Sequence, residues 1–427
     1  MIHRDSIKDI LETAPHVRVL CIRGPRQAGK TTVAELCFPT YRHVGCDRVA
    51  QKKAINEDPS AFLRNILATY PGIVLDEFQQ VPDILSEIRA YVDETGERGR
   101  IILTGSQNYL MMASVTQSLA GRVILIDMLP LSINELQQAN VLPNNVYDLM
   151  IRGGYPELYQ DQKLSTTRFY KGYINTYMER DLQTLTNVPD LAKFHRFLQF
   201  CAGRIGQLLN VSTLAADAGV TVALANQWLS LLVTSYLIYL VSPHVTNFNK
   251  QLVKQPKLYF YDTGIACELL NIGTASKLAK HTMRGALFEN FVITESFKWC
   301  HTHGKNPALY FWRDEQGHEI DLVVDLGGPL VPIEIKSADV VRQNMTDVLS
   351  FWHELTGHPL EQSYVIYTGE DEKHTVGPQF LSWKSIPVLF ATLYAPDADN
   401  ETQPMQASIV KKKKKPVAKT VPHKKAK

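Results

Sequence analysis

An eight-residue segment, GPRQAGKT at positions 24–31, constrains the fold of this 427-residue chain more than any other feature. It follows a short apolar run, VRVLCIR at 17–23, and it precedes a helical pattern, TTVAELC at 31–37. The segment fits the pattern G-x-x-x-x-G-K-[ST], whose glycines let successive backbone N–H groups point into one concavity. The following helix adds the positive end of its dipole. Strand, loop and helix together predict a phosphate-binding loop in an α/β domain.

The residue types in this loop predict how ATP and Mg²⁺ would be held. Lys30 is expected to reach the β- and γ-phosphates, and the hydroxyl of Thr31 is expected to bind Mg²⁺. Ser106, in the segment TGSQ that ends a later strand, is the expected sensor of the γ-phosphate, with Thr104 and Gln107 left open as alternatives. The expected cradle consists of consecutive residues: Gly24, Pro25, Arg26, Gln27, Ala28, Gly29, Lys30, Thr31 and Thr32.

Two carboxylates follow a second buried strand, GIVL at 72–75. Asp76 is expected to hold Mg²⁺ through water, and Glu77 is expected to polarise the water that attacks the γ-phosphate. A pair of acids at a strand end is common, but its position about 50 residues after a phosphate-binding loop makes it characteristic of nucleotide hydrolysis.

Arg122 stands between a helical segment, LAG at 119–121, and the apolar run VILID at 123–127. This junction predicts an arginine that points off the nucleotide edge of the sheet and acts as an arginine finger on a neighbouring copy of the chain. That role implies a homo-oligomer. A cation that stabilises a helix C-terminus is the alternative.

A second group of charged residues lies in the C-terminal third. Glu289 falls in the helical segment 284–299, Asp321 falls in the strand HEIDLVV, and Glu334 and Lys336 end the strand LVPIEIK. Residues two apart in a strand share a face, so Glu334 and Lys336 are expected to point the same way. The three carboxylates predict a site for Mg²⁺ or Mn²⁺, with Lys336 orienting or neutralising the nucleophile. A structural network of buried charges is the alternative.

The order and spacing of this second group are similar to those of PD-(D/E)xK nucleases. The series GPRQAGKTT, GIVLDEFQQVPDIL, IILTGSQNYLMM, LAGRVILIDMLPLSINEL, GGYPELY and YMERDL resembles the AAA-family ATP-binding proteins of bacteria and archaea. The resemblance covers about residues 15–395. It implies an AAA-type ATPase core, a winged-helix-like middle and a C-terminal nuclease-like fold, and it implies no particular cellular process.

Short β-branched runs that alternate with helical patterns predict an α/β fold with a parallel sheet in the N-terminal part. A helical pattern follows, then a helix-turn-helix rhythm with a strand at 257–261, and then a second α/β unit. The expected organisation is an ATPase core at 1–130, a helical lid at 131–190, a winged-helix-like module at 191–275, a PD-(D/E)xK-like domain at 276–395 and a disordered basic tail at 396–427.

Charge and composition indicate the setting. Residues 401–427 hold nine lysines and one acid, a net charge of +8, while the whole chain has a net charge of +2. The tail is expected to bind DNA or RNA by counterion release, or to act as a solubilising tail. The six cysteines form no CxxC pair, the N-terminus has no signal-peptide core, and the longest apolar stretch, 228–241, is too short to span a bilayer. We expect a soluble, cytoplasmic protein that binds no membrane.

These features favour Mg²⁺-dependent ATP hydrolysis, coupled to a nuclease-like domain that acts on nucleic acid. Two alternatives stay open: a metal-dependent nuclease gated by ATP, and an ATP-switched scaffold with an inactive nuclease fold. The intact carboxylate of Glu77 argues against a scaffold without turnover.

Overall fold

The computed structural model describes residues 2–106, 115, 118–177, 191–244, 253–328, 330–371 and 377–395. By its contacts the chain divides into two units, Met1–Leu393 and Tyr394–Lys427. The tail predicted for 396–427 lies outside the described residues, so its expected disorder stays a prediction, as do the boundaries of the predicted domains.

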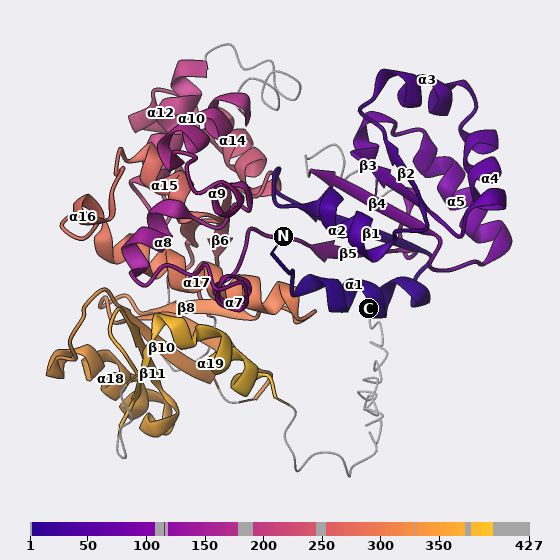
Figure 1. The fold of residues 1–427 in the computed structure, drawn as a ribbon. Coiled ribbons are helices and arrows are strands. Elements are labelled where there is room, and N and C mark those ends of the chain that lie inside the picture. Colours follow the sequence, from indigo (N-terminus) through magenta and orange to yellow (C-terminus); the bar gives the residue numbers. More distant parts are fainter. Residues whose placement is uncertain are drawn as a thin grey trace, which may run out of the picture. The chain divides into compact units, whose positions relative to one another are not determined.

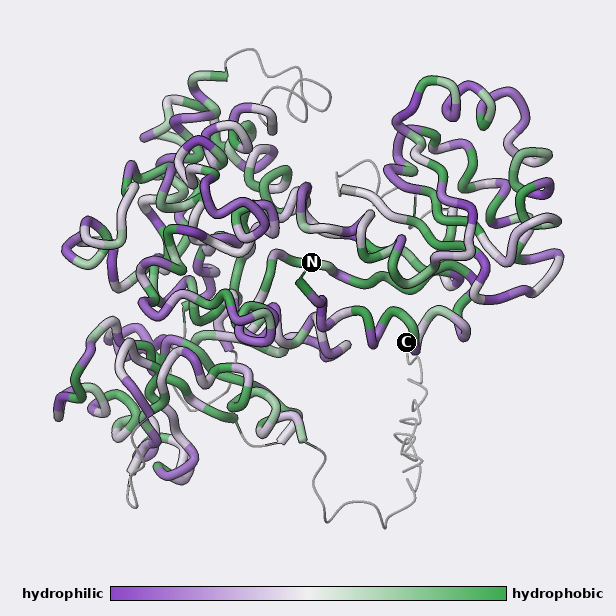
Figure 2. The backbone as a smooth tube through the Cα atoms, in the orientation of Figure 1, coloured by the Kyte–Doolittle hydropathy of each residue, from purple (hydrophilic) through white to green (hydrophobic). Residues whose placement is uncertain are grey.

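The N-terminal part is built on a five-stranded sheet in the order β2-β3-β4-β1-β5, in which every neighbouring pair is parallel (Figure 1). This arrangement confirms the predicted parallel α/β fold and brings the C-terminal ends of all five strands to one edge. The strands are mostly hydrophobic (Figure 2) because helices cover both faces. Their bounds are β1 Val19–Gly24, β2 Arg42–Gly45, β3 Ile73–Asp76, β4 Ile101–Ser106 and β5 Val123–Asp127.

Alternate residues of β1 contribute to two hydrophobic cores on opposite faces of this sheet. Leu20 and Ile22 pack with residues of α1 and α2, whereas Val19 and Cys21 pack with residues of α4 and α5. This alternation follows from the period of two in a strand. The helices of this part are α1 Ser6–Thr13, α2 Lys30–Cys37, α3 Val49–Glu57, α4 Pro59–Thr69 and α5 Ile84–Thr95.

The middle of the chain is largely helical. Thr221 accepts a hydrogen bond from the backbone N–H of Leu224 and caps α14, and Gly219 ends α13 in the left-handed conformation. Strands β6 and β7 pair antiparallel. The elements are α7 Ile133–Gln138, α8 Val146–Arg152, α9 Glu157–Gln160, α10 Thr166–Tyr177, α12 Leu191–Ala202, α13 Val211–Ala218, α14 Val222–Thr234, β6 Ile238–Val241, β7 Lys257–Phe260, α15 Thr263–Leu269 and α16 Ala275–Leu278.

The C-terminal part contains a mixed sheet in the order β12-β11-β10-β9-β8. Strands β8, β9 and β10 are antiparallel neighbours, and β10, β11 and β12 are parallel neighbours. This sheet confirms that a second α/β unit follows the helical middle. Its elements are α17 Arg284–Thr302, β8 Leu309–Arg313, β9 Glu319–Asp325, β10 Leu330–Lys336, α18 Asp347–Thr356, β11 Tyr364–Tyr367, β12 Gln379–Ser382 and α19 Ile386–Leu393.

No single helix within the described ranges has the length and apolar character to cross a membrane. Helices α13 and α14 have the required length and apolar character only when they are taken together, and a bend of 102° separates them.

Candidate nucleotide site and carboxylate cluster

The predicted phosphate-binding loop connects the end of β1 to the start of α2, at the edge of the sheet where the strands end. Gly24 has φ +152°, and a Cβ added there would lie 2.1 Å from the carbonyl oxygen of Met128. Gly29 has φ +94° and directly precedes α2. Both positions favour glycine because φ is positive. At Gly24 the backbone of Met128 also leaves no room for a side chain.

Lys30 is the first residue of α2, and its side chain returns along the loop. Its Nζ donates hydrogen bonds to the carbonyl oxygens of Gly24, at 3.1 Å, and Pro25, at 2.7 Å. The residue is only 6% exposed. Burial lowers the pKa of Lys30 to about 8, although the carboxylates of Glu77 and Asp76 oppose this shift. The cation is thus held among loop carbonyls at the place where phosphate oxygens are expected.

Asp76, at the end of β3, lies beside the loop. The hydroxyl of Thr31 donates to Asp76 Oδ2 at 2.9 Å, and the hydroxyl of Thr104 on the intervening strand β4 donates to Oδ1. Hydroxyl and carboxylate oxygens are the ligands that Mg²⁺ prefers, so these residues fit the expected ion. Of the three candidate sensors, Thr104 contacts Asp76, Gln107 lies outside the described residues, and so does the side chain of Ser106.

Glu77 follows Asp76 in a left-handed backbone conformation, with φ +52° and ψ +43°. Such a conformation is uncommon for a residue with a side chain, and residues in it are enriched at active sites. The side-chain amide of Gln79 donates a hydrogen bond to Glu77 Oε2. Gln79, which no sequence pattern singled out, thus orients the carboxylate expected to act as the base.

Arg4 is a residue that the sequence analysis missed. It is 4% exposed, and its guanidinium donates to the carbonyl oxygens of Ala28 and Leu129, both at 2.6 Å. It also forms a buried ion pair with Glu135 at 2.8 Å. Arg4 therefore ties the phosphate-binding loop to the segment that follows β5. A sequence signal existed for its partner Glu135. The S-x-x-E pattern of Ser132 and Glu135 predicts a capping box, and the capping box is formed.

The predicted place of Arg122 is wrong. The backbone carbonyl of Arg122 accepts a hydrogen bond from Val19, the first residue of β1, so Arg122 lies at the edge where the strands begin. The phosphate-binding loop lies at the opposite edge. The guanidinium binds both carboxylate oxygens of Asp93 on α5, at 2.6 and 2.8 Å. A finger role on a neighbouring copy, and the homo-oligomer that it implies, stay predictions.

Asp127, the last residue of β5, connects three parts of the chain. It binds Arg23, the neighbour of the loop residue Gly24, through contacts of 2.6 and 2.9 Å. It also accepts a hydrogen bond from Tyr236, which precedes β6, and lies 3.5 Å from the imidazole of His301 on α17. Burial would raise the pKa of Asp127, but the hydrogen bonds and the charge of Arg23 outweigh burial and lower it.

The second predicted group also comes together. Lys336 forms an ion pair with Glu334, and Asp321 Oδ2 accepts a hydrogen bond from the backbone N–H of Ile335 at 2.9 Å. Burial, assisted by the charge of Asp321, raises the pKa of Glu334 well above its usual value. The pKa of Glu289 is raised to about 7, chiefly by burial; the charge of Lys257 opposes this shift and the charge of Asp321 contributes to it. We call Glu289, Asp321, Glu334 and Lys336 the carboxylate cluster.

Lys257 on β7 is a second cation in this cluster, and the sequence analysis missed it. It is 1% exposed, and its Nζ lies 3.0 Å from Glu289 Oε1 and 2.5 Å from Glu319 Oε1. The hydroxyl of Tyr259 donates to the same oxygen of Glu289 at 2.6 Å. Lys257 thus supplies a counter-charge for Glu289.

A cavity of about 590 Å³ opens beside the carboxylate cluster and is lined by Asp321, Glu334 and Lys336. Within the described residues, no group of three or more His, Cys, Asp and Glu side chains has the geometry of a metal site. The metal expected at Glu289, Asp321 and Glu334 therefore stays a prediction.

Three family descriptions match successive parts of the chain. Residues 16–137 match an AAA domain, residues 144–276 match a domain of unknown function (DUF8612), and residues 284–386 match another domain of unknown function (DUF4143). The parallel sheet, the loop between β1 and α2, and the first match define the N-terminal part as an AAA-type P-loop ATPase domain.

Two curated proteins are similar to this chain over most of its length. The uncharacterized proteins Rv2008c of Mycobacterium tuberculosis and Mb2031c of Mycobacterium bovis are each 28% identical over 378 residues, which cover 86% of this chain and 80% of each relative. Among solved structures, the Walker-type ATPase of Pyrococcus abyssi has a TM-score of 0.43 at 14% identity, and the similarity covers 63% of this chain and 96% of that protein. A STAND protein of Pyrococcus horikoshii has a TM-score of 0.27 at 12% identity, with coverage of 69% and 46%.

Proposed function

We propose that the chain hydrolyses ATP with the aid of Mg²⁺ at the loop between β1 and α2. The observation that carries this proposal is the contact between Thr31 and Asp76, whose oxygens lie 2.9 Å apart beside the N-terminus of α2. Strands β3 and β1 are not neighbours, yet the ends of both strands deliver their residues to one point at the edge of the sheet. This is the arrangement that binding of Mg²⁺ and triphosphate requires.

Each residue then has a distinct task. The backbone N–H groups of the loop bind the phosphate oxygens, and Lys30 moves from the loop carbonyls to the β- and γ-phosphates. Thr31 and Asp76 would hold Mg²⁺, which neutralises the charge that develops on the phosphates. Glu77, oriented by Gln79, accepts a proton from the attacking water.

Two substitutions separate binding from hydrolysis. Lys30→Ala should abolish ATP binding because it removes the cation expected over the phosphates. Glu77→Gln should keep ATP binding and lose turnover, since an amide forms hydrogen bonds but accepts no proton. Glu57→Gln, an exposed position on α3 in the same domain, is the matched control. ATP binding is measured by calorimetry and turnover by phosphate release. Wild-type turnover in Glu77→Gln would remove Glu77 from the mechanism.

A second function is favoured by the carboxylate cluster. We propose that the C-terminal part has a PD-(D/E)xK-like fold that binds Mg²⁺ or Mn²⁺ and cleaves a phosphodiester bond. Asp321 on β9 and Glu334 and Lys336 at the E-x-K end of β10 line one cavity. Glu289 on α17 lies close enough for its charge to interact with Asp321 and Lys336. The ion would polarise the phosphate and activate water, while Lys336 would orient or neutralise the nucleophile.

We further propose a winged-helix-like fold for the middle module. The bend of 102° between α13 and α14 and the antiparallel pair of β6 and β7 support this interpretation. Isolated bridges from Ile205 and Leu208 to β7 add a third extended segment. Helix α14 contains neither lysine nor arginine, so docking of a protein and action as a lid are as compatible with its face as DNA binding is.

The carboxylate cluster can be tested without assuming its substrate. Mn²⁺ binding to the full chain is measured by calorimetry for wild type, Asp321→Ala and the control Glu354→Ala, which alters an exposed acid on α18. Cleavage of DNA and RNA is followed with and without ATP. We expect Asp321→Ala alone to lose both Mn²⁺ binding and cleavage. The absence of both in the wild type, in every nucleotide state, would reduce the cluster to a structural network.

A further inference from the structure

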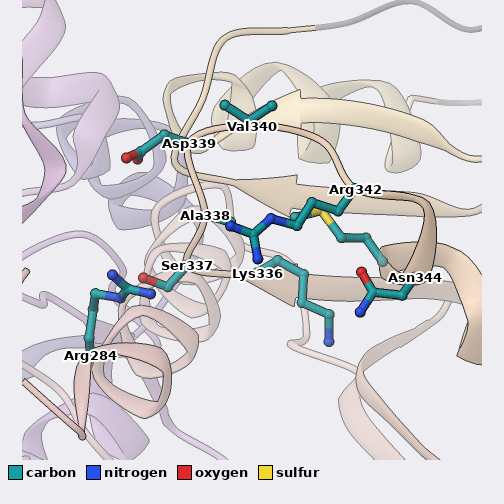
Figure 3. Close-up of a pocket in the computed structure, with 9 residues that line it drawn as sticks. Arg284, Lys336, Ser337, Ala338, Asp339, Val340, Arg342 and Asn344 are labelled. Atoms are coloured by element: carbon teal, nitrogen blue, oxygen red, sulfur yellow. The ribbon is translucent and has the colours of Figure 1, made fainter.

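A second cavity, of about 480 Å³, lies at the end of β10 and carries positive charge. Arg284, Lys336 and Arg342 line it together with Ser337 and Asn344 (Figure 3). These residues come from the start of α17, the end of β10 and the segment before α18. Three cations from separate elements thus converge on one cavity large enough for a nucleotide unit.

Lys336 is paired with Glu334, but among the described residues that line this cavity no acid neutralises the two arginines. Its acidic residue, Asp339, accepts a hydrogen bond from the Thr368 hydroxyl at 2.6 Å, and its carboxylate points away from Lys336 and Arg342 in Figure 3. Arg284 donates to the carbonyl oxygen of Ala279 at 3.0 Å, which orients the guanidinium without neutralising it. In the described part of the chain, the ion pairs at or below 4.0 Å include none between an acid and Arg284 or Arg342. The cavity therefore favours an anion.

This basic cavity adjoins the carboxylate cluster. Lys336, Asn344 and Met345 line both the cavity of about 480 Å³ and the cavity of about 590 Å³ that contains Asp321 and Glu334. The cavity of about 590 Å³ is lined by carboxylates and therefore favours a cation. The cavity of about 480 Å³ is lined by arginines and therefore favours an anion. A metal ion together with a phosphate chain satisfies both sides, because the phosphates bind metal and arginine alike.

We propose that Arg284 and Arg342 bind a backbone phosphate of a nucleic acid strand, next to the phosphate that reacts at the carboxylate cluster. This inference rests on the proposed phosphodiester cleavage and names its substrate class. Arginine is suited to the task because its planar guanidinium binds two phosphate oxygens and stays charged at any physiological pH. A strand is favoured over a free nucleotide because the two adjoining cavities can receive neighbouring phosphates of one chain.

The test measures binding separately from cleavage. The full chain is titrated in EDTA with a fluorescein-labelled single-stranded 12-mer DNA, and anisotropy is read over a range of salt concentrations. Arg284→Gln and Arg342→Gln should each weaken binding by about tenfold and reduce the slope of log K against log salt by roughly 0.7, the value for one lost contact with a single strand. Arg168→Gln, an exposed arginine on α10, should change neither.

All variants keep the lysine-rich tail, so its contribution is the same in each comparison. Arg342 is exposed, and Arg342→Glu should reverse the attraction and weaken binding further without affecting the fold. Unchanged affinity and slope in the three pocket variants would overturn the proposal. Competition by micromolar AMP that equals competition by unlabelled 12-mer would also overturn it, in favour of a nucleotide site.

The outcome is distinguishable from failure of the proposed cleavage. If wild type cleaves and Asp321→Ala does not, while the arginine variants bind normally, the cavity proposal alone is refuted. If no nucleotide state supports cleavage but the arginine variants bind DNA less tightly, the cavity proposal stands and the cleavage proposal fails.

Discussion

Asp127→Asn should destabilise the protein more than any substitution of an exposed acid in the same domain. The carboxylate of Asp127 is 11% exposed and the guanidinium of Arg23 is 19% exposed, and they are joined by two short contacts. Asparagine keeps the shape of the side chain and removes its charge. Arg23 would then lose the charge of Asp127 while its guanidinium stays largely buried, a loss that water only partly relieves.

The magnitude follows from this burial. Removing one partner of a fully buried ion pair costs roughly 3–5 kcal/mol. Because about a fifth of the Arg23 side chain reaches solvent, we expect the lower end, about 3 kcal/mol. Tyr236 adds to the loss, since its hydroxyl also donates to Asp127. With a urea slope of about 2–3 kcal/mol per molar, the unfolding midpoint should fall by roughly 1 M.

The assay is urea unfolding followed by far-UV circular dichroism at pH 7. Asp93→Asn is a matched control, because Asp93 also binds an arginine, Arg122, through both carboxylate oxygens, and does so at the surface. Exposed ion pairs contribute little, so this variant should unfold close to wild type. Equal urea midpoints for Asp127→Asn and Asp93→Asn would refute the view that the buried charge of Asp127 stabilises the protein.

Three further predictions concern other charged groups. Lys257→Met should destabilise the protein by about 3 kcal/mol at pH 8 and by less at pH 5, because protonated Glu289 needs no counter-charge. Burial lowers the pKa of His301, so the unfolded chain binds a proton more tightly than the folded chain does. The free energy of unfolding should therefore fall as the pH drops below 6.5. His301→Gln should reduce this pH dependence, whereas His3→Gln, at an exposed position, should not. Deleting 411–427 should reduce the salt slope of DNA binding by several units, and an unchanged slope would make the tail a bystander.

The fold was predictable wherever local pattern decides the structure. The apolar runs at 17–23 and 72–75 form β1 and β3, because strands buried on both faces need continuous apolar sequence. Glu334 and Lys336 share a face of β10 because of the two-residue period of a strand. The loop at 24–31 was predictable because its glycines are required by the backbone and not by distant contacts.

The missed residues act through contacts that no local pattern encodes. Arg4 binds residues 24, 125 and 131 positions away in the sequence, and Lys257 binds Glu289 and Glu319, which are 32 and 62 positions away. The misplacement of Arg122 has a simpler cause. A residue that precedes a parallel strand lies at the edge where strands begin, whereas nucleotide sites lie at the edge where strands end.

Helix α17 contacts the segment that follows β5 of the ATPase domain, and it also carries Glu289 of the carboxylate cluster. Glu295 accepts a hydrogen bond from the backbone N–H of Ile133 at 2.7 Å, and Lys298 donates to the carbonyl oxygen of Leu131 at 2.9 Å, so the helix holds the segment after β5. Near its end, His301 lies against Asp127, the partner of Arg23 beside the phosphate-binding loop.

Glu289 lies twelve residues before His301 on the same helix, a distance of about 18 Å at 1.5 Å per residue. A helix buried on most sides moves as a unit, because its packed side chains resist bending. Helix α17 is therefore a continuous element that links Asp127, through His301, to Glu289.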